Sequence, residues 1–375
     1  MVENKYMVFV SCMTYNHSAF IEEAMNGFCK QQTTFPFVCA IIDDASTDEE
    51  QKIISNYLYD HFAVEDKNIT IKEETDNYEL IYTRHKTNNN CYFVVLFLKY
   101  NHYKKKPKSP YVKEWLNNSK YVALCEGDDY WIDSNKLQKQ VDFLENNLEF
   151  TMTCNRSLLY SVRRNAYVGE SFCYDKDSIV KVNDVIYRTG LFISTCSIVY
   201  RRSLKENYPN YCRKCKVGDY PLQIMAAMKG SIYYFNNIMS VYRIGNKNSW
   251  MGQRKLLSAD PQRLDIIQSR IDMFRGFSED YPQYRNLFNN KIVDEIRRNM
   301  PNSMKDYEEL KKYILYFHSE ISKFSLLRKI DFYLMRTRIP FLNKYYKTKD
   351  IFSKYSCRIL KYKSPISNIS KNRFD

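Results

Sequence analysis

The sequence lacks any long hydrophobic run. No stretch reaches the about 18 consecutive apolar residues that a membrane-spanning helix requires, and the longest candidate, CYFVVLFLKY at 91–100, has the length of a buried strand. The first residues, MVENKYMVFVSCM, also lack the basic segment and the small-residue cleavage site of a secretory signal peptide. These absences lead us to expect a cytoplasmic protein.

Metal-binding patterns of cysteine and histidine are also missing. The 11 cysteines are an odd number and lie mostly in apolar runs, as reduced core thiols do. The one CxxC pair, Cys212 and Cys215, has no second pair and no nearby histidine, which argues against a zinc site. Glycine is scarce, with 9 residues, and there is neither an internal repeat nor a low-complexity linker. Because 44% of the residues are hydrophobic, we expect a packed core.

The net charge of +14 is concentrated at one end of the chain. From Lys323 onward, 14 Lys and Arg residues stand against 3 Asp residues, so this tail carries +11 and the first 322 residues are close to neutral. Aromatic and aliphatic residues are interleaved with the basic ones. Three interpretations stay open: a solvated helical face, a segment that binds an anionic membrane surface, and a nucleic-acid-binding segment, which has the least support.

The first part of the chain alternates strand and helix patterns. Apolar strands are expected at 6–13, 37–44 and 68–74, and amphipathic helices at 18–32 and 46–62. This order predicts a parallel sheet with right-handed crossovers. The strands are continuously apolar, which is typical of a sheet covered on both faces.

The remainder of the chain adds a few strands and then becomes helical. We expect a short helix at 111–119, a strand from 121, a helix at 134–147, a strand at 192–203, a helix within 217–231 and a strand pair at 232–245. From about residue 260 only helical periodicity remains, at 264–274, 283–299, 305–319 and 325–335.

Two pairs of adjacent aspartates follow the ends of apolar strands. Asp43 and Asp44 end the strand at 37–44, and Asp128 and Asp129 follow the strand that begins at 121, with Glu126 just before them. Ligands bind outside the carboxyl ends of parallel strands, so we expect both pairs at one crevice. Repulsion within the second group favours a bound cation, and oxygen ligands suit Mg²⁺ or Mn²⁺. The alternative is that both pairs are turn and cap residues.

Asp219 is a third acid that needs an explanation. It precedes Pro221 at the expected start of a helix, where aspartate is a common cap. A lone carboxylate in that position is equally suited to act as a general base toward an alcohol. The sequence pattern alone leaves both interpretations open.

Several segments resemble, in their order, the bacterial family 2 glycosyltransferases with the GT-A fold. They are VSCMTYNHSAFIEEAM, IIDDASTDEE, YVALCEGDDYWIDSNKLQKQVDFLE, STCSIVYRRS and GDYPLQIMAAMKGSIYYFNNIMSVYRI, within roughly residues 6–250. The resemblance implies an α/β fold, a Rossmann-like, mostly parallel sheet flanked by helices, with a C-terminal helical extension. We therefore expect a GT-A domain at 1–255 and a helical, basic region at 256–375.

The resemblance also implies a role for nine acidic, aromatic or basic residues. Tyr15, Asp43 and Asp44 would bind the nucleotide; Asp128 and Glu126 would hold Mg²⁺ or Mn²⁺; Asp219 would be the catalytic base; Asp129, Trp131 and Arg243 would line the sugar or acceptor pocket. One departure is Gly245, which stands where similar sequences place a histidine. Arg243 or the basic loop at 104–106 are candidates to replace it.

The function implied is an inverting, metal-dependent sugar transfer. A nucleotide-diphosphate sugar would be the donor, and a hydroxyl of a glycan or lipid-linked acceptor would attack it during surface polysaccharide or lipopolysaccharide assembly. The enzyme would be cytoplasmic, with the tail as a peripheral anchor at the inner face of the plasma membrane. The competing interpretation is a nucleic-acid-binding protein in which the acidic pairs are only structural.

Overall fold

The computed structural model describes residues 5–103, 105–188, 192–246, 261–300 and 307–324. Within them, twelve strands form one mixed sheet with the order β10-β12-β8-β11-β6-β1-β2-β5-β4-β3, while β7 pairs with β12 and β9 pairs with β8. The strands are β1 (Tyr6–Thr14), β2 (Phe37–Asp43), β3 (Ile71–Glu74), β4 (Tyr78–Arg84), β5 (Cys91–Leu98), β6 (Ser119–Leu124), β7 (Tyr130–Trp131), β8 (Phe150–Ser161), β9 (Ala166–Ser171), β10 (Ser178–Ile179), β11 (Val199–Arg201) and β12 (Ser231–Ile244).

The centre of the sheet is parallel. Strand β1 lies between β2 and β6, and β5 continues the parallel order beyond β2. All seven residues of β2 are buried, as expected for a parallel strand covered on both faces. Thr14 lies opposite Asp43 and Ser11 lies opposite Leu124, so the carboxyl ends of β2 and β6 emerge on either side of the end of β1.

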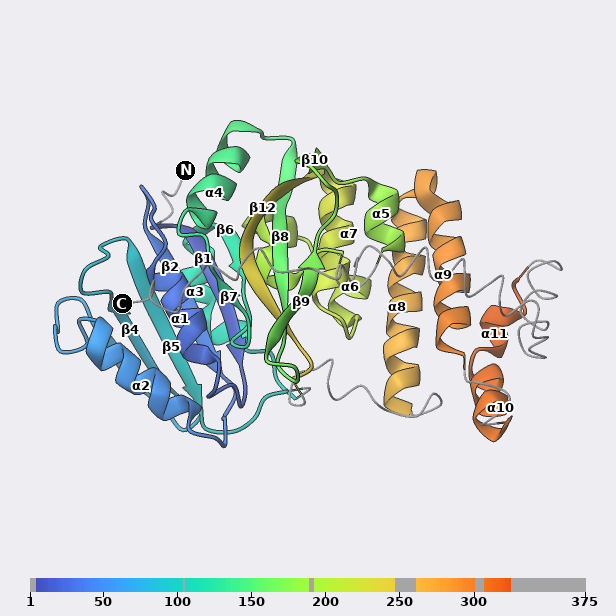
Figure 1. Ribbon diagram of the computed structural model, residues 1–375. Helices are drawn as coiled ribbons and strands as arrows, with labels where there is room; N and C mark the ends of the chain where they lie inside the picture. Colours follow the sequence, from blue (N-terminus) through green and yellow to red (C-terminus); the bar gives the residue numbers. More distant parts are fainter. Residues whose placement is uncertain (1–4, 104, 189–191, 247–260, 301–306, 325–375) are drawn as a thin grey trace.

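The described helices cover the two faces of the sheet and extend beyond it (Figure 1). They are α1 (Ile21–Cys29), α2 (Glu50–His61), α3 (Lys113–Asn117), α4 (Lys136–Asn146), α5 (Val182–Tyr187), α6 (Asn210–Lys214), α7 (Asp219–Lys229), α8 (Pro261–Asp280), α9 (Arg285–Asn299), α10 (Tyr307–Tyr316) and α11 (His318–Ile321). Short 3-10 turns lie at Ser109–Val112, Thr195–Ser197, Arg202–Lys205 and Pro282–Tyr284.

Two hydrophobic clusters lie on opposite faces of the sheet. One buries the apolar faces of α1, α2 and α4 against alternate residues of β1 and β2. The other joins the remaining residues of these strands to α7, α8 and α9, so the C-terminal helices share a core with the sheet. Figure 1 shows α8 to α11 at the end of the molecule opposite α1 and α2. The α/β architecture with a helical extension is therefore confirmed.

The segment 68–74 differs from its expected role as a third parallel strand. It forms only the four-residue β3, which is exposed throughout and pairs antiparallel with β4 at the sheet edge. Strand β5 takes the inner position next to β2. The reason is composition, because the apolar run of β5 can be buried on both faces and the sequence IKEE cannot.

Two further elements differ from expectation. The segment 232–245 is one long strand, β12, whose irregular register between Phe235 and Ile238 accommodates Asn236 and Asn237 without a turn. The expected strand at 192–203 is a 3-10 turn followed by the short β11. The expected helix at 325–335 and the basic tail lie outside the described residues. Among the described residues, no helix is long and apolar enough to cross a membrane.

Candidate active site

The first aspartate pair, at the end of β2, is held by partners inside the protein. The Asp44 carboxylate accepts a hydrogen bond from the His102 backbone N–H at 2.7 Å and forms an ion pair with Lys108 Nζ at 2.7 Å. The side chains of Asp44 and Lys108 are 4% and 15% exposed, so this pair is largely shielded from water. Both carboxylate oxygens of Asp44 therefore already have partners.

Asp43 is buried in the same turn. Its Oδ1 accepts hydrogen bonds from the Ser46 backbone N–H and the Gln51 side chain. Burial raises the pKa of Asp43, and the hydrogen bonds from Ser46 and Gln51 oppose this shift. Tyr15, half-buried, directly follows β1 beside this turn.

Lys108 was missed by the sequence interpretation, which considered only the basic residues at 104–106. Its loop is fixed near Asp44 by several contacts. Asn101 donates a side-chain hydrogen bond to the Asp44 carbonyl at 3.0 Å, and the His102 ring stacks on Tyr100 with 4.5 Å between centroids. In the sequence, Lys108 is a lysine that follows a proline in a loop, and this pattern alone does not indicate which residue it pairs with.

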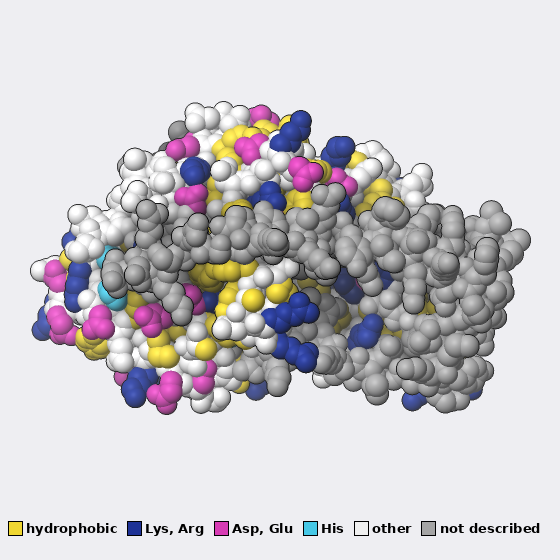
Figure 2. All heavy atoms as spheres, viewed as in Figure 1, with side chains coloured by type: hydrophobic (Ala, Val, Ile, Leu, Met, Phe, Trp, Pro, Cys, Tyr) yellow, Lys and Arg dark blue, Asp and Glu magenta, His cyan; other side chains and the backbone are white. Residues whose placement is uncertain are grey.

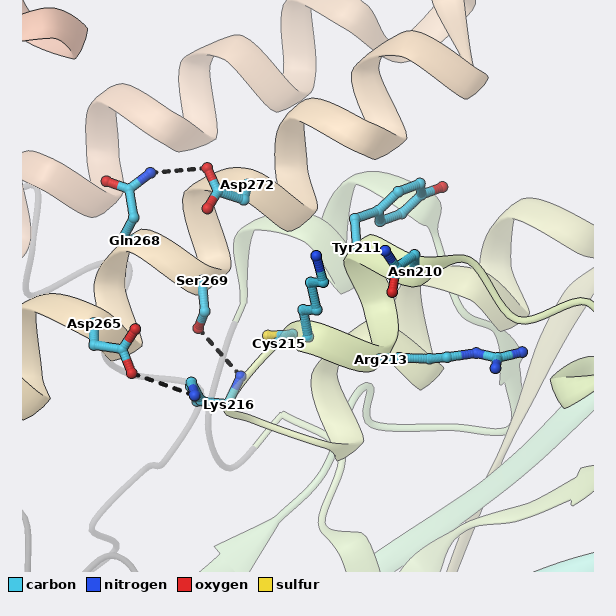
Figure 3. Close-up of a pocket in the computed structure, with 10 residues that line it drawn as sticks. Asn210, Tyr211, Arg213, Cys215, Lys216, Asp265, Gln268, Ser269 and Asp272 are labelled. Carbon is cyan, nitrogen blue, oxygen red and sulfur yellow. Dashed lines mark hydrogen bonds and ion pairs between the residues drawn. The ribbon is translucent and has the colours of Figure 1, made fainter. Parts of the chain in front are cut away.

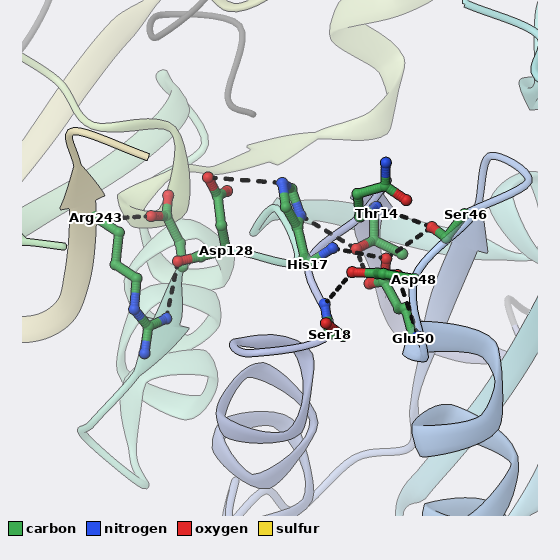
Figure 4. Close-up of polar contacts among 10 residues, drawn as sticks. Thr14, His17, Ser18, Ser46, Asp48, Glu50, Asp128 and Arg243 are labelled. Atoms are coloured by element: carbon green, nitrogen blue, oxygen red, sulfur yellow. Dashed lines mark hydrogen bonds and ion pairs between the residues drawn. The ribbon is translucent and has the colours of Figure 1, made fainter. Parts of the chain in front are cut away.

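The second pair, at the turn after β6, is held from β12 (Figure 4). The Arg243 backbone N–H donates to Asp129 Oδ1 at 2.8 Å, and the Arg243 guanidinium donates to the Asp128 carbonyl oxygen at 2.8 Å. The guanidinium also pairs with Glu23. Arg243, 6% exposed, is thus bound to the protein itself and supports the acidic turn, where we had expected it to line a pocket.

Asp129 and Trp131 are also buried, in contrast to their expected place in a sugar or acceptor pocket. Asp129 is 1% exposed and Trp131 is 3% exposed. The Trp131 indole packs edge-on against Phe28 at 4.9 Å and donates to the Cys196 carbonyl oxygen at 2.9 Å. Its large apolar surface is therefore used in the core.

Gly127 lets the acidic turn approach β1 closely. A Cβ atom built at this position would lie 2.2 Å from Thr14 Oγ1 and 3.2 Å from His17 Nδ1. A glycine is therefore required sterically between Glu126 and Asp128. The consequence is that Asp128, 6% exposed, lies beside His17, with 3.8 Å between Asp128 Oδ2 and His17 Nε2.

Asp219 lies at the first turn of α7 and is electrostatically linked to the turn after β6. Burial raises the pKa of Asp219, while the backbone N–H groups of Asp219 and Tyr220 lower it. The surrounding protein, and to a lesser degree the charges of Asp128 and Asp219, raise the pKa of Glu126, but its side chain is exposed and water screens this shift. Glu126, Asp128 and Asp219 come from two segments far apart in the chain and are therefore close enough to interact.

Not every expected contact among the acids is present. Asp44 is paired with Lys108, and the charges that raise the Glu126 pKa come from Asp128 and Asp219. Among the described residues, no three His, Cys, Asp or Glu side chains form a ready metal-binding group. Gly245, where a histidine was sought, has a φ of 82°, a conformation that favours glycine.

A cavity of about 630 Å³ lies between α6 and α8 (Figure 3). Lys216 joins its two walls, since its backbone N–H donates to Ser269 Oγ at 3.1 Å and its Nζ pairs with Asp265 at 3.4 Å. Burial and, to a lesser degree, the charge of Asp219 raise the pKa of Cys215, which lines the cavity. The cavity is therefore close to the start of α7.

The chain was compared with known proteins. No protein-family model matches it. The uncharacterized proteins Mb1547 of Mycobacterium bovis and Rv1520 of Mycobacterium tuberculosis are each 29% identical to it over 240 residues, which is 64% of this chain and 59% of each relative. The chain thus spans less than two thirds of the length of these relatives.

Solved structures with a similar fold include residues 1–349 of TarS from S. aureus. The complex of TarS with UDP-GlcNAc matches with a TM-score of 0.52 and 15% identity over 84% of this chain and 81% of that chain. The complex of TarS with UDP gives a TM-score of 0.50 over 84% of this chain and 80% of that chain. The likeness and the sheet order together show an α/β, GT-A-like fold.

Proposed function

We propose that the protein is an inverting, metal-dependent glycosyltransferase related to family 2. It would move a hexose from a nucleotide-diphosphate sugar to a hydroxyl of a glycan or lipid-linked acceptor, in surface polysaccharide or lipopolysaccharide assembly. The observation that supports this proposal is that the acids of the turn after β6, at the end of a parallel strand, are close enough to Asp219 for its charge to act on Glu126. Binding sites in open α/β sheets lie at this edge.

The acids after β6 fit a divalent cation. Asp128 and Glu126 supply oxygen ligands of the kind that Mg²⁺ and Mn²⁺ prefer. The buried Asp129 Oδ2 has no hydrogen-bond partner among the described residues, and three carboxyl groups lie within four residues of this turn, so a cation would offset their repulsion when they are ionised. When bound, Mg²⁺ or Mn²⁺ would stabilise the negative charge of the departing nucleoside diphosphate.

Asp219 is the proposed general base. Its raised pKa makes it a better proton acceptor than an ordinary aspartate, provided that the pH keeps it ionised. The backbone N–H groups at the start of α7 hold the carboxylate in place. Asp219 would take the proton of the acceptor hydroxyl as its oxygen attacks the anomeric carbon, so that attack and departure on opposite faces invert the configuration.

The donor nucleotide would bind at the end of β2, beside Tyr15. Asp44 is suited to accept an N–H of the base, with Asp43 supporting the turn, and Lys108 adds a donor for a carbonyl or phosphate oxygen. The UDP-GlcNAc complex of the similarly folded TarS supports a nucleotide-sugar as the donor class.

The acceptor would bind toward the cavity between α6 and α8, because this cavity is close to Asp219. Its walls offer amide, hydroxyl, carboxylate and ammonium groups, which are the partners that sugar hydroxyls use. We divide the chain into a GT-A domain at 1–255 and a helical, basic region at 256–375 that contributes one wall.

A cytoplasmic location, with the basic tail at the inner face of the plasma membrane, belongs to the same proposal. The tail holds most of the net charge of the sequence. On the face shown in Figure 2, acidic and basic side chains are interspersed over the described part. A nucleic-acid-binding domain would spread basic residues over its folded face, whereas the sequence concentrates them in the tail, which favours the enzyme over the nucleic-acid-binding alternative.

A donor screen tests the proposal. Purified full-length protein is incubated with UDP-, GDP- and CMP-linked sugars, with and without Mn²⁺, and release of the nucleotide is measured. We expect hydrolysis of one donor class that requires the metal and is lost in Asp128→Asn and Asp219→Asn. Equal inactivity toward all donors, with no thermal stabilisation by any nucleotide, would contradict the proposal.

A further inference from the structure

His17 is fixed at the end of β1 by a hydrogen-bonded chain that includes the buried Glu50 (Figure 4). Glu50, 0% exposed, accepts the His17 backbone N–H at 2.9 Å and the Ser46 hydroxyl at 2.8 Å through Oε2. The Thr14 hydroxyl bonds to the other oxygen, Oε1. The position of His17 is thus determined by an acid on α2, which lies on the side of the sheet opposite the helical extension.

The same chain determines which ring nitrogen of His17 carries the proton. Glu50 receives two donors on Oε2, so as a carboxylate it takes the Thr14 hydroxyl hydrogen on Oε1. Thr14 Oγ1 then has only a lone pair for His17 Nδ1, which lies 3.2 Å away. Nδ1 is therefore an N–H donor, and in the neutral ring, the form that binds a metal ion, Nε2 presents a lone pair.

The lone pair of Nε2 faces another acceptor. His17 Nε2 and Asp128 Oδ2 are 3.8 Å apart, too far for a hydrogen bond between them, and both side chains are about nine-tenths buried, at 10% and 9% exposure. In the neutral ring, two acceptors would face each other in a shielded place, and a cation between them would offset their repulsion. Two ligands that are each about 2.1 Å from one cation lie at most about 4.2 Å apart. The observed separation is therefore compatible with a shared ion.

We propose that His17 Nε2 is a ligand of the divalent cation held by Asp128. This inference rests on the proposed function, and it gives that site an imidazole from β1 in place of the histidine missing at Gly245. The Thr14 hydroxyl and Glu50 would orient the ring, as outer partners of metal-bound histidines do.

The identity of the ion follows from the ligand types. Mg²⁺ prefers oxygen ligands and near-ideal octahedral geometry, whereas imidazole suits transition metals. A site with one nitrogen and carboxylate oxygens should therefore bind Mn²⁺ more tightly than Mg²⁺. Loss of the imidazole should reduce Mn²⁺ affinity and leave Mg²⁺ affinity less affected.

The deciding variant is His17→Asn in the full chain. The asparagine amide can still donate toward Thr14 and lacks an atom at the position of Nε2. Binding of Mn²⁺ alone is measured by electron paramagnetic resonance, with Mg²⁺ as a competitor. Asp128→Asn is the reference for loss of the site, and His61→Asn, exposed on α2, is the matched histidine control.

We expect His17→Asn to weaken Mn²⁺ binding at least about 10-fold, Asp128→Asn to weaken it as much or more, and His61→Asn to match the wild type. Wild-type Mn²⁺ affinity in His17→Asn, together with loss in Asp128→Asn, would overturn the role of His17 and leave the proposed function standing. Failure of the wild type to bind Mn²⁺ would instead remove the metal dependence of the proposed function itself.

A second measurement does not depend on the stability of a variant. In ¹⁵N-histidine-labelled wild-type protein, small amounts of Mn²⁺ should broaden the His17 resonances before those of the other histidines. Broadening that spares His17 would contradict the assignment.

Discussion

The two aspartate pairs have the same sequence and different surroundings. At the end of β2, Asp44 has an ion pair with Lys108 and a hydrogen bond from His102. At the turn after β6, the Arg243 guanidinium is bonded to a backbone carbonyl and to Glu23, leaving the Asp128 carboxylate beside His17.

This difference separates a charge that the protein compensates with its own cation from charges that it leaves uncompensated. At the β2 pair that cation is Lys108, so removal of Lys108 should lower the stability of the protein. At the β6 turn three carboxyl groups, Glu126, Asp128 and Asp129, lie within four residues of one another without a lysine or arginine ion pair to Asp128 from the part of the chain that the structure describes. A folded protein tolerates repulsion between neighbouring carboxylates where a bound cation offsets it. Substitutions at the two turns should therefore have different consequences.

The largest effect is expected for Asp219→Asn, which tests whether the β6 turn and α7 form one site. Loss of the base should lower the turnover rate about 100- to 10,000-fold with donor affinity unchanged. Because the Asp219 pKa is raised, wild-type turnover should fall as the pH drops through a value above that of an ordinary aspartate. Turnover is measured between pH 4 and 9; a variant with wild-type turnover would exclude Asp219 as the base.

Asp128→Asn should have the next largest effect and is the direct test of the β6 turn. We expect Mn²⁺-dependent donor hydrolysis to fall at least about 100-fold, because a metal ligand should matter more than the outer partners that are worth 10- to 100-fold. The free energy of unfolding should change little or increase, since repulsion with Glu126 is relieved. Asp142→Asn, an exposed acid on α4, is the control. Unchanged metal dependence would mean that the cation binds elsewhere.

The sequence predicted the acidic ends of the strands well, because a parallel sheet places successive carboxyl ends at one edge whatever the loops do. Thr14, Asp43 and Leu124 lie where that rule puts them. Asp219 at the start of α7 also followed from local pattern. These features depend on periodicity and on residues close together in the chain.

The partners of the acids could not be predicted in the same way. The Lys108–Asp44 pair joins a loop to a strand end far away in the chain, and no local spacing encodes such a contact. Trp131 stands next to the acids in sequence, and its side chain nevertheless turns into the core against Phe28. Position along the chain gives the place of the backbone, and the direction of a side chain depends on packing that only the folded structure contains.

Lys108→Met tests how much the ion pair at the β2 end contributes to stability. Removing one partner of a shielded ion pair leaves the Asp44 carboxylate without its cation, which should cost about 3 kcal/mol of unfolding free energy. The double variant with Asp44→Asn should recover part of this loss, because no unpaired charge remains. Urea denaturation of the single and double variants measures both values. Lys105→Met, exposed in the same loop, controls for general loop effects; equal stability of all variants would show that the pair contributes nothing.

The smallest effect concerns the turn that follows the β2 pair, where Asp48 connects two loops. Its carboxylate accepts the Glu50 backbone N–H at 3.2 Å and the Ser18 backbone N–H at 3.0 Å. The Ser18 side chain makes no cap hydrogen bond to α1, whose N-cap is Phe20. We therefore expect Asp48→Ala to cost about 1 kcal/mol of unfolding free energy and Ser18→Ala less than about 0.5 kcal/mol. Urea denaturation measures the loss of unfolding free energy in both variants. A larger loss in Ser18→Ala would mean that the Ser18 hydroxyl, and not the Asp48 carboxylate, stabilises this turn beside His17.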